Sequence, residues 1–196
     1  MMVASLKDLP RPHYRLEEYF ALERAGQARY EYWNGYVLCM SGGSRQHATI
    51  CSNVHFRLSQ QLEKKACRTY TGEMQIKTPD LPPYRYPDVS VVCGKPVFEK
   101  MEGFDVLTNP ILVVEVLSPG TAHLDRQEKR EAYQALPSVM EYLIISQDAP
   151  HVTQYLRQPD GKWLRNDAGD LTAIIKLPSI GCTLPLREVY DDVEFV

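Results

Sequence analysis

The sequence predicts a mixed α/β domain in which helices pack against a mixed β-sheet. The order of predicted elements is helix, hairpin, helix, several strands, helix and further strands, which is typical of a sheet covered by helices. Residues 111–114 form a continuous apolar run, as expected for a strand buried on both faces. The length of 196 residues fits one domain with a substantial core.

The first forty residues predict a helix followed by a hairpin. After a Pro-rich start, residues 16–25 have the pattern of a short amphipathic helix that ends at Gly26. Residues 30–40 predict the hairpin, because the segments YEYW and YVLCM are rich in aromatic and β-branched residues. Asn34 and Gly35 stand between them, and this dipeptide is the strongest two-residue hairpin signal.

Ser44 is placed to cap the longest predicted helix, which covers residues 45–66. Its apolar face consists of residues three or four positions apart, namely His47, Cys51, Val54, Leu58 and Leu62. Strands, loops and two further helices are predicted after Cys67. They are strands at 68–70 and 73–77, a Pro-rich loop at 78–85, a strand within 86–94, a polar loop, a strand within 109–121, a helix at 125–136, strands at 141–146, 151–157 and 163–165, and a polar tail with a short helix at 186–190.

Composition limits the class of protein. The chain has 22 Lys and Arg against 25 Asp and Glu, so a net charge of -3 argues against a protein coated in positive charge, although a local basic groove remains compatible. The five cysteines are far apart and without zinc-knuckle spacing, which predicts reduced core residues. No segment has the ~18 consecutive apolar residues of a membrane span. We therefore expect a cytoplasmic protein without membrane association.

Glu115 is the most informative charged residue. It interrupts the apolar run of residues 111–117, in a strand that otherwise has the pattern of a fully buried one. A buried carboxylate must be paired, protonated or bound to a metal, because an isolated one costs several kcal/mol. An internal salt bridge would satisfy it structurally, but a functional carboxylate is the interpretation we favour.

Asp88 follows Pro87 at the start of a second apolar strand, residues 89–93. By itself, an Asp at this position is typical of a turn cap. Together with Glu115, however, it would place two carboxylates near the same edge of two adjacent strands. Such a pair can hold an oxygen-ligated Mg²⁺ or Mn²⁺, which activates water and neutralises a phosphate.

Lys129 lies between Asp125 and Tyr133 at steps of four, so these residues share one face of the predicted helix. One interpretation is an exposed Asp–Lys ion pair, which is common and contributes only ~0.3 to 0.5 kcal/mol. The other interpretation is a cation above the metal site, where it would orient the attacking water or stabilise the phosphate. Spacing alone leaves both open.

These motifs resemble those of the PD-(D/E)XK restriction-endonuclease-like superfamily, and most closely its Uma-type endonucleases. The resemblance rests on YEYWNGYVLCM, SRQHATICSNV, YRYPDVSVVCG and EVLSPGTAHLDRQEKREAYQALPSVMEYLII, with DGKWL and LPLREVY near the end. It covers residues 14–190 and implies one restriction-endonuclease-like domain over 1–196, with an N-terminal helix and hairpin, helices flanking a mixed sheet, and a flexible lead at 1–13.

The resemblance also implies site residues. Asp88 and Glu115 take the positions of the family's metal ligands. The superfamily's catalytic Lys would be at position 117, where this chain has Leu117. The Uma-type branch has a helical Lys at the position of Lys129, which could carry the same charge from a different element.

Glu31 and His47 match two further positions of the family. Glu31 could add another carboxylate to the site, although an outward-facing residue of a hairpin is the alternative. His47 is near the start of the long helix on its apolar face. A hydrogen-bonded core histidine is therefore the slightly favoured interpretation, with a role in the site as the alternative.

Two functions follow from these observations. The first is a metal-dependent endonuclease that hydrolyses phosphodiester bonds in DNA by metal-activated water, with Mg²⁺ or Mn²⁺ as cofactor and with a homodimer as a compatible assembly. The second is a catalytically inactive nuclease-like module that binds nucleic acid or another protein. Leu117 in place of the superfamily's Lys favours the second function, and the set of carboxylates favours the first.

Overall fold

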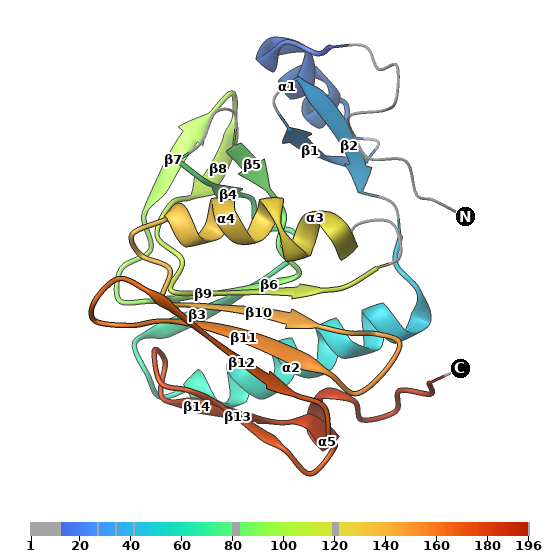
Figure 1. Cartoon of the computed structure of the whole chain (residues 1–196). Helices are drawn as coiled ribbons and strands as arrows, with labels where there is room; N and C mark the ends of the chain where they lie inside the picture. Colours follow the sequence, from blue (N-terminus) through green and yellow to red (C-terminus); the bar gives the residue numbers. More distant parts are fainter. Residues whose placement is uncertain are drawn as a thin grey trace.

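The computed structural model describes residues 13–26, 28–33, 35–40, 42–79, 83–118 and 122–195. Within these ranges the chain forms two six-stranded sheets, a two-stranded sheet and five helices (Figure 1). The predicted mixed α/β class is confirmed, but the strands expected in one sheet divide between two. The predicted lead at 1–13 falls, apart from His13, outside the described residues.

The first sheet contains the N-terminal hairpin. Its strands, in spatial order, are β2 (Tyr36–Met40), β1 (Arg29–Trp33), β5 (Pro83–Arg85), β4 (Ile76–Lys77), β8 (Phe104–Leu107) and β7 (Phe98–Met101). The predicted hairpin is confirmed, since β1 and β2 pair antiparallel, although Asn34 is outside the described residues. Helix α1 (Leu16–Ala25), which has the predicted bounds, packs its aromatic side chains Tyr19 and Phe20 against this sheet.

The second sheet forms the centre of the molecule. Its strands, in spatial order, are β12 (Trp163–Ala168), β11 (Val152–Arg157), β10 (Glu141–Ile145), β9 (Leu112–Val116), β6 (Val89–Cys93) and β3 (Cys67–Thr71). Only the pair β9 and β10 is parallel among these described strands, and α3 (Ala122–Arg126) and α4 (Glu128–Ala135) connect them. Every residue of β9 is buried, as the continuous apolar run predicts.

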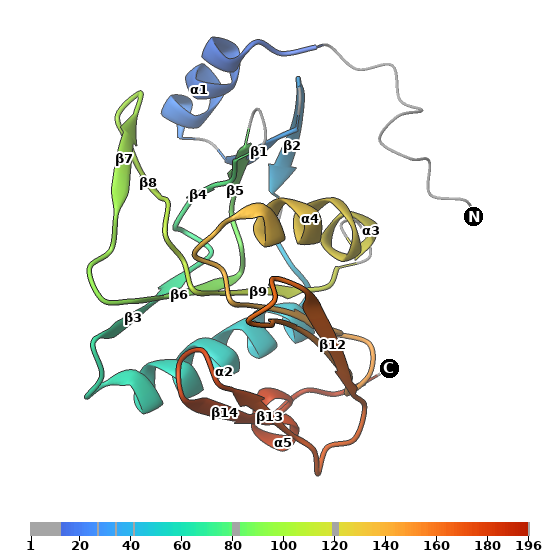
Figure 2. The same cartoon turned by 60° about the vertical axis from the view of Figure 1, so that its left-hand side comes forward.

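Helices cover both faces of this second sheet. Figure 2 shows α2 (Arg45–Leu62) on one face and α3 and α4 on the other. Val114 and Val116 belong to the core cluster that contains the apolar face of α2, whereas Val113 and Leu117 belong to the cluster on the side of α4. Because strand side chains alternate, Glu115 points to the same side as Val113 and Leu117, toward α4.

The helices differ from prediction at their ends. The Ser44 cap is confirmed, because its hydroxyl accepts the backbone N–H of His47 at 3.0 Å. Helix α2 ends at Leu62, four residues before the predicted end. The helix predicted at 125–136 is interrupted at Gln127, whose backbone (φ -123°, ψ -77°) is not helical.

Two regions predicted as loop contain hairpins. The polar loop after residue 94 includes β7 and β8, whose exposed charged side chains hide the alternation of a strand. The predicted polar tail contains β13 (Ile174–Leu177) and β14 (Cys182–Pro185), followed by α5 (Leu186–Val189). Buried residues of β13 and β14 join the core cluster of α2, so this hairpin completes the cover of that helix.

The prediction that all five cysteines are reduced is wrong for one pair. Cys67 and Cys93 face each other on β3 and β6 and form a disulfide. They are 26 positions apart in the chain, so only the register of the two strands reveals the pairing. Cys39, Cys51 and Cys182 are free. In the part of the chain that the structure describes, no helix is long and apolar enough to cross a membrane.

Candidate active site

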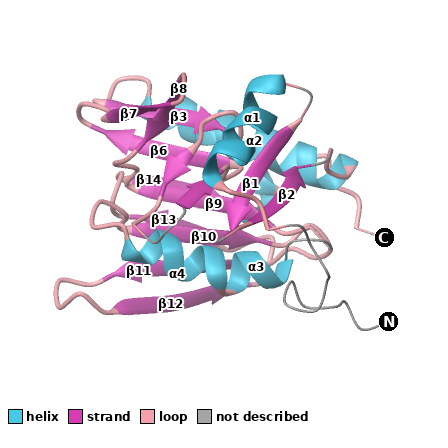
Figure 3. Ribbon diagram, turned by 90° about the horizontal axis from the view of Figure 1, so that it is seen from above, coloured by secondary structure: helices cyan, strands magenta, loops and turns pink. Residues whose placement is uncertain are grey.

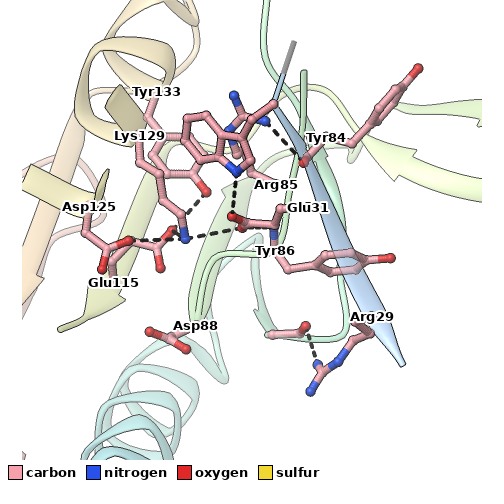
Figure 4. Close-up of polar contacts among 12 residues, drawn as sticks. Arg29, Glu31, Tyr84, Arg85, Tyr86, Asp88, Glu115, Asp125, Lys129 and Tyr133 are labelled. Carbon is pink, nitrogen blue, oxygen red and sulfur yellow. Dashed lines mark hydrogen bonds and ion pairs between the residues drawn. The ribbon is translucent and has the colours of Figure 1, made fainter. Parts of the chain in front are cut away.

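Lys129 is the centre of a buried charged cluster. Its Nζ atom lies 3.2 Å from a carboxylate oxygen of each of three residues, Glu31, Glu115 and Asp125 (Figure 4). None of these four residues is more than 3% exposed to solvent. The cluster therefore joins β1, β9, α3 and α4, and it places three acidic groups around one ammonium group.

Local structure explains how the helix contributes to this cluster. Lys129 and Tyr133 are four positions apart on α4, so they share a face that turns toward β9, and Asp125 reaches the same ammonium group from α3. The Tyr133 hydroxyl donates a hydrogen bond to Glu115 Oε1 at 3.0 Å, beside the Lys129 ammonium. The interpretation of Asp125 and Lys129 as an exposed surface pair is wrong, because both are 1% exposed.

Glu31 comes from the other sheet. It is fully buried, so the alternative of an outward-facing hairpin residue is wrong. The backbone N–H of Tyr86 donates to Glu31 Oε1 at 2.9 Å, and the indole N–H of Trp33 donates to Oε2 at 3.3 Å. These bonds hold the carboxylate toward Lys129, whose ion pairs with Glu31 and Glu115 connect the two sheets.

Burial and charge together determine the protonation of the cluster. Burial raises the pKa of Glu115 well above its usual range, and the neighbouring carboxylates Asp125 and Asp88 add to this effect against the opposing charge of Lys129. Burial by itself would lower the pKa of Lys129, but Glu115, Glu31 and Asp125 outweigh it and hold that pKa well above its usual range. Lys129 therefore stays protonated and acts as a fixed cation.

Asp88 lies next to this cluster at the start of β6. Val89 of β6 pairs with Val114 of β9, and continuing this register by one residue places Asp88 opposite Glu115. The Asp88 carboxylate accepts the backbone N–H of Val116 at 2.7 Å. The two predicted metal ligands are therefore brought to the same end of two adjacent strands.

His47 reaches Asp88 from the first turn of α2. Its Nε2 atom lies 3.4 Å from Asp88 Oδ2. Burial lowers the pKa of His47, but the hydrogen bond and charge of Asp88 outweigh burial, so the pKa is raised overall. His47 therefore lies next to the predicted site residue Asp88. Because 18% of its side chain is exposed, it is not a fully buried core residue.

A cavity of about 670 Å³ connects these groups to solvent. Glu115 and Lys129 are almost completely buried, whereas Asp88 and His47 are partly exposed. Sequence reasoning did not assign several polar residues that also line this cavity. They are Arg29, Ser44, Cys51, Tyr86, Ser118 and Gln147. Two of them had a signal in the sequence: Ser44 is the predicted cap of the long helix, and Cys51 is four positions after His47 on the same helix face.

Two sets of side chains could hold a metal ion. Asp88 and Glu115 offer carboxylate oxygens, which suit Mg²⁺ or Mn²⁺. The second set is His47, Cys51 and Asp88, whose ligand atoms lie within 4.8 Å of one another. Burial raises the pKa of the Cys51 thiol, which keeps it protonated and makes it a poor ligand. A site of carboxylate oxygens suits Mg²⁺ or Mn²⁺ better than a site that includes a protonated thiol, and Asp88 and Glu115 as metal ligands stay a prediction.

Comparison with known proteins assigns the chain to a family. The model of Uma2, described as "Putative restriction endonuclease", matches residues 16–187. The chain belongs to the Uma2 family. The resemblance inferred from the PD and EVLSPGT motifs is thereby confirmed.

The chain is also similar to two proteins of Synechocystis sp. (strain PCC 6803), both named as uncharacterised. One, slr1290, is 32% identical over 196 residues, covering 99% of this chain and all of the relative. The other, sll1609, is 30% identical over 164 residues, covering 84% of this chain and 89% of the relative.

A crystal structure from Anabaena variabilis, described as "a putative nuclease belonging to DUF820", has the same fold. It superposes with a TM-score of 0.68 at 17% identity, covering 84% of this chain and 90% of that one. The predicted fold class, a mixed α/β fold with helices flanking a mixed sheet, is therefore confirmed.

Proposed function

We propose that this Uma2 protein is a nuclease that hydrolyses phosphodiester bonds in DNA and depends on Mg²⁺ or Mn²⁺. The observation that carries the proposal is the buried cluster of Lys129 with three carboxylates, which ends in the cavity that Asp88 also lines. The description of the Uma2 family supports the reaction class.

The charge of the cavity supports a divalent cation. Counting Asp88, four carboxyl groups share one buried ammonium group, and the other three carboxylates add to the burial that raises the pKa of Glu115. A cation held by Asp88 and Glu115 would compensate this excess of acid. When bound there, Mg²⁺ or Mn²⁺ would neutralise charge on the phosphate and lower the pKa of a water molecule, which is the chemistry that phosphodiester hydrolysis requires.

The remaining residues position these two ligands. Lys129 stays protonated, so in this proposal it does not accept a proton from water; it holds Glu115 through an ion pair and takes the place of the cation missing at Leu117. Glu31 orients Lys129 from the opposite side. His47 orients Asp88 and adds positive charge near the phosphate when it is protonated.

Leu117 favours a second candidate function, a nuclease-like module without catalysis. Its side chain packs in the core cluster beside Tyr133 and Ile144, so position 117 contributes no charge to the site. In this alternative the cluster around Lys129 is an internal salt bridge that stabilises the fold, and the cavity binds nucleic acid or protein. A cytoplasmic location and a homodimer remain predictions under both functions.

Cleavage of supercoiled plasmid tests the proposal. The wild-type protein with Mg²⁺ or Mn²⁺ should convert it to relaxed or linear DNA, and EDTA should stop the reaction. D88N and E115Q should lower the rate by about 100-fold or more, the scale seen when one group that stabilises transition-state charge is lost. E128Q is the matched control, because Glu128 is an exposed carboxylate of the same helix as Lys129.

Metal binding measured by calorimetry separates the two candidate functions. Mn²⁺ binding that is lost in D88N and E115Q, together with cleavage, supports the nuclease. Equal cleavage by wild type, D88N and E115Q would show that a contaminant cuts the DNA and would refute the proposal. Mn²⁺ binding to the wild type without cleavage of any plasmid form, or no Mn²⁺ binding at millimolar concentration, would favour the inactive module.

A further inference from the structure

A second cavity, of about 500 Å³, lies between the α3–α4 pair and strands β10 to β12. Figure 3 shows these two helices running along β10 and β11. Arg126 and Arg130 directly follow Asp125 and Lys129, so they project from a neighbouring face of the helices. The charged and aromatic residues that line the cavity are Arg126, Arg130, Glu131, His151, Tyr155 and Arg165.

Cations outnumber acids in this second cavity. Arg165 donates to both carboxylate oxygens of Asp167, at 2.8 and 3.0 Å, and His151 lies 3.6 Å from the same carboxylate. Arg130 lies 3.5 Å from its chain neighbour Glu131. Arg126 is exposed and has no ion pair within the described ranges. The three arginines and His151 are therefore accompanied by only two carboxylates, those of Glu131 and Asp167.

The Arg130 guanidinium is held in place by an aromatic ring. Its carbon lies 5.4 Å from the centroid of Tyr155, a distance typical of cation–π contact. The Tyr155 ring is in turn stacked on Tyr142, which is fully buried. Arg130 is thereby presented on a rigid support, and a planar guanidinium matches the oxygens of a phosphate group.

The two cavities meet where β9 and β10 end. Leu117 lines the second cavity, whereas its neighbours Val116 and Ser118 line the cavity that contains Asp88. Likewise, Ser146 lines the second cavity and Gln147 the first. The same two chain segments therefore lie between the cavities, which are neighbours at this end of the central sheet.

We propose that the second cavity binds a backbone phosphate of DNA adjacent to the phosphate that is cleaved. This inference rests on the proposed nuclease function and adds a specificity to it, since substrates that extend past the cleaved bond gain an ion pair. A net charge of -3 is compatible with nucleic-acid binding if the protein has a local basic surface. In this inference the second cavity is that surface.

DNA binding measured by fluorescence anisotropy tests the inference without cleavage. A labelled oligonucleotide is titrated with protein in EDTA and in Ca²⁺, for wild type and for the double variant R126Q/R130Q. The variant should bind about 10-fold more weakly, and the slope of log K against log salt should fall in magnitude by about 1, as expected for loss of one phosphate contact. R15Q/R24Q, which removes the same charge from exposed positions at the N-cap and in the last turn of α1, should bind like wild type.

Oligonucleotides with and without a 5′-phosphate distinguish the source of the bound phosphate. A backbone site predicts equal weakening for both, whereas weakening confined to the 5′-phosphorylated one would assign the cavity to a terminal phosphate and overturn the inference. Equal affinity of R126Q/R130Q and R15Q/R24Q, or no binding by wild type in either buffer, would also overturn it. If D88N loses plasmid cleavage while R126Q/R130Q binds DNA normally, this inference fails and the nuclease proposal stands.

Discussion

The two cavities on either side of the ends of β9 and β10 differ in how far their charged side chains are buried and paired. In the first, Lys129 and its carboxylates are buried, and every charge depends on its partner. In the second, Arg126 and Arg165 are exposed and Arg130 is partly exposed, so water screens their charges and ion pairs contribute little. We therefore expect changes in the first cavity to alter folding as well as activity, and changes in the second to alter mainly ligand binding.

Removal of the buried cation should have the largest effect. K129M leaves Glu31, Glu115 and Asp125 facing one another without compensation, which should lower the free energy of unfolding at neutral pH by about 3 to 5 kcal/mol, as for other buried ion pairs that lose one partner. Urea denaturation followed by circular dichroism measures this loss. R130Q, one residue along the same helix, is the control.

The proposed difference between the two cavities would be wrong if K129M and R130Q lowered the free energy of unfolding by similar amounts. A loss below about 1 kcal/mol in K129M would mean that the three carboxylates take up protons at little cost or that water reaches them. A loss of several kcal/mol in R130Q would mean that the second cavity is also structural. Either result would remove the distinction between a structural and a ligand-binding charge cluster.

A divalent cation should have the next largest effect, and only in the first cavity. At a metal concentration ten times the dissociation constant, binding to the folded state adds about 1.4 kcal/mol to its stability. Thermal unfolding with and without Mn²⁺ should show this increase in wild type and in R126Q/R130Q. The increase should be absent in D88N, and an equal increase in D88N would place the metal elsewhere.

The sequence predicts the first cavity better than the second for a physical reason. Glu115 is conspicuous because it interrupts an apolar run, and the four-residue steps of Asp125, Lys129 and Tyr133 report one helix face. Burial thus leaves a local signal at each of these residues. Spacing could not decide whether Lys129 reaches Glu115, because this depends on how α4 packs on β9.

Contacts between distant segments account for what the sequence did not predict. Glu31 reaches Lys129 because β1 pairs with β5, and the chain runs directly from β5 of the first sheet into β6 of the second. The Cys67–Cys93 disulfide likewise depends on strand register. Arg126 and Arg165 have no local pattern at all, since an exposed arginine on a helix or an edge strand is ordinary in any soluble protein. Only the packing of α3 and α4 over β10 to β12 brings them together.

Asp167 provides the smallest expected effect on stability and the sharpest contrast between the cavities. Its hydrogen bonds from Arg165 lower the pKa of its carboxyl group, with smaller contributions from Thr153 and His151. A lowered pKa in the folded state means that the carboxylate stabilises the fold above its unfolded pKa of 3.8, and that this contribution is lost as the pH falls through the lower folded value. Because 39% of the side chain is exposed, D167N should cost at most about 0.5 kcal/mol at neutral pH.

The same substitution should strengthen DNA binding, because it releases Arg165 and His151 from the carboxylate that competes with phosphate. Anisotropy titrations should show D167N binding DNA several-fold more tightly than wild type, with a steeper dependence on salt. Urea denaturation from neutral pH to below 3.8 should show the small stability difference disappearing at the acid end. We therefore expect that removal of an acid from the first cavity abolishes metal binding, whereas removal of the acid beside the second cavity improves DNA binding. Weaker DNA binding by D167N would mean that Asp167 positions Arg165 for the phosphate and does not compete with it.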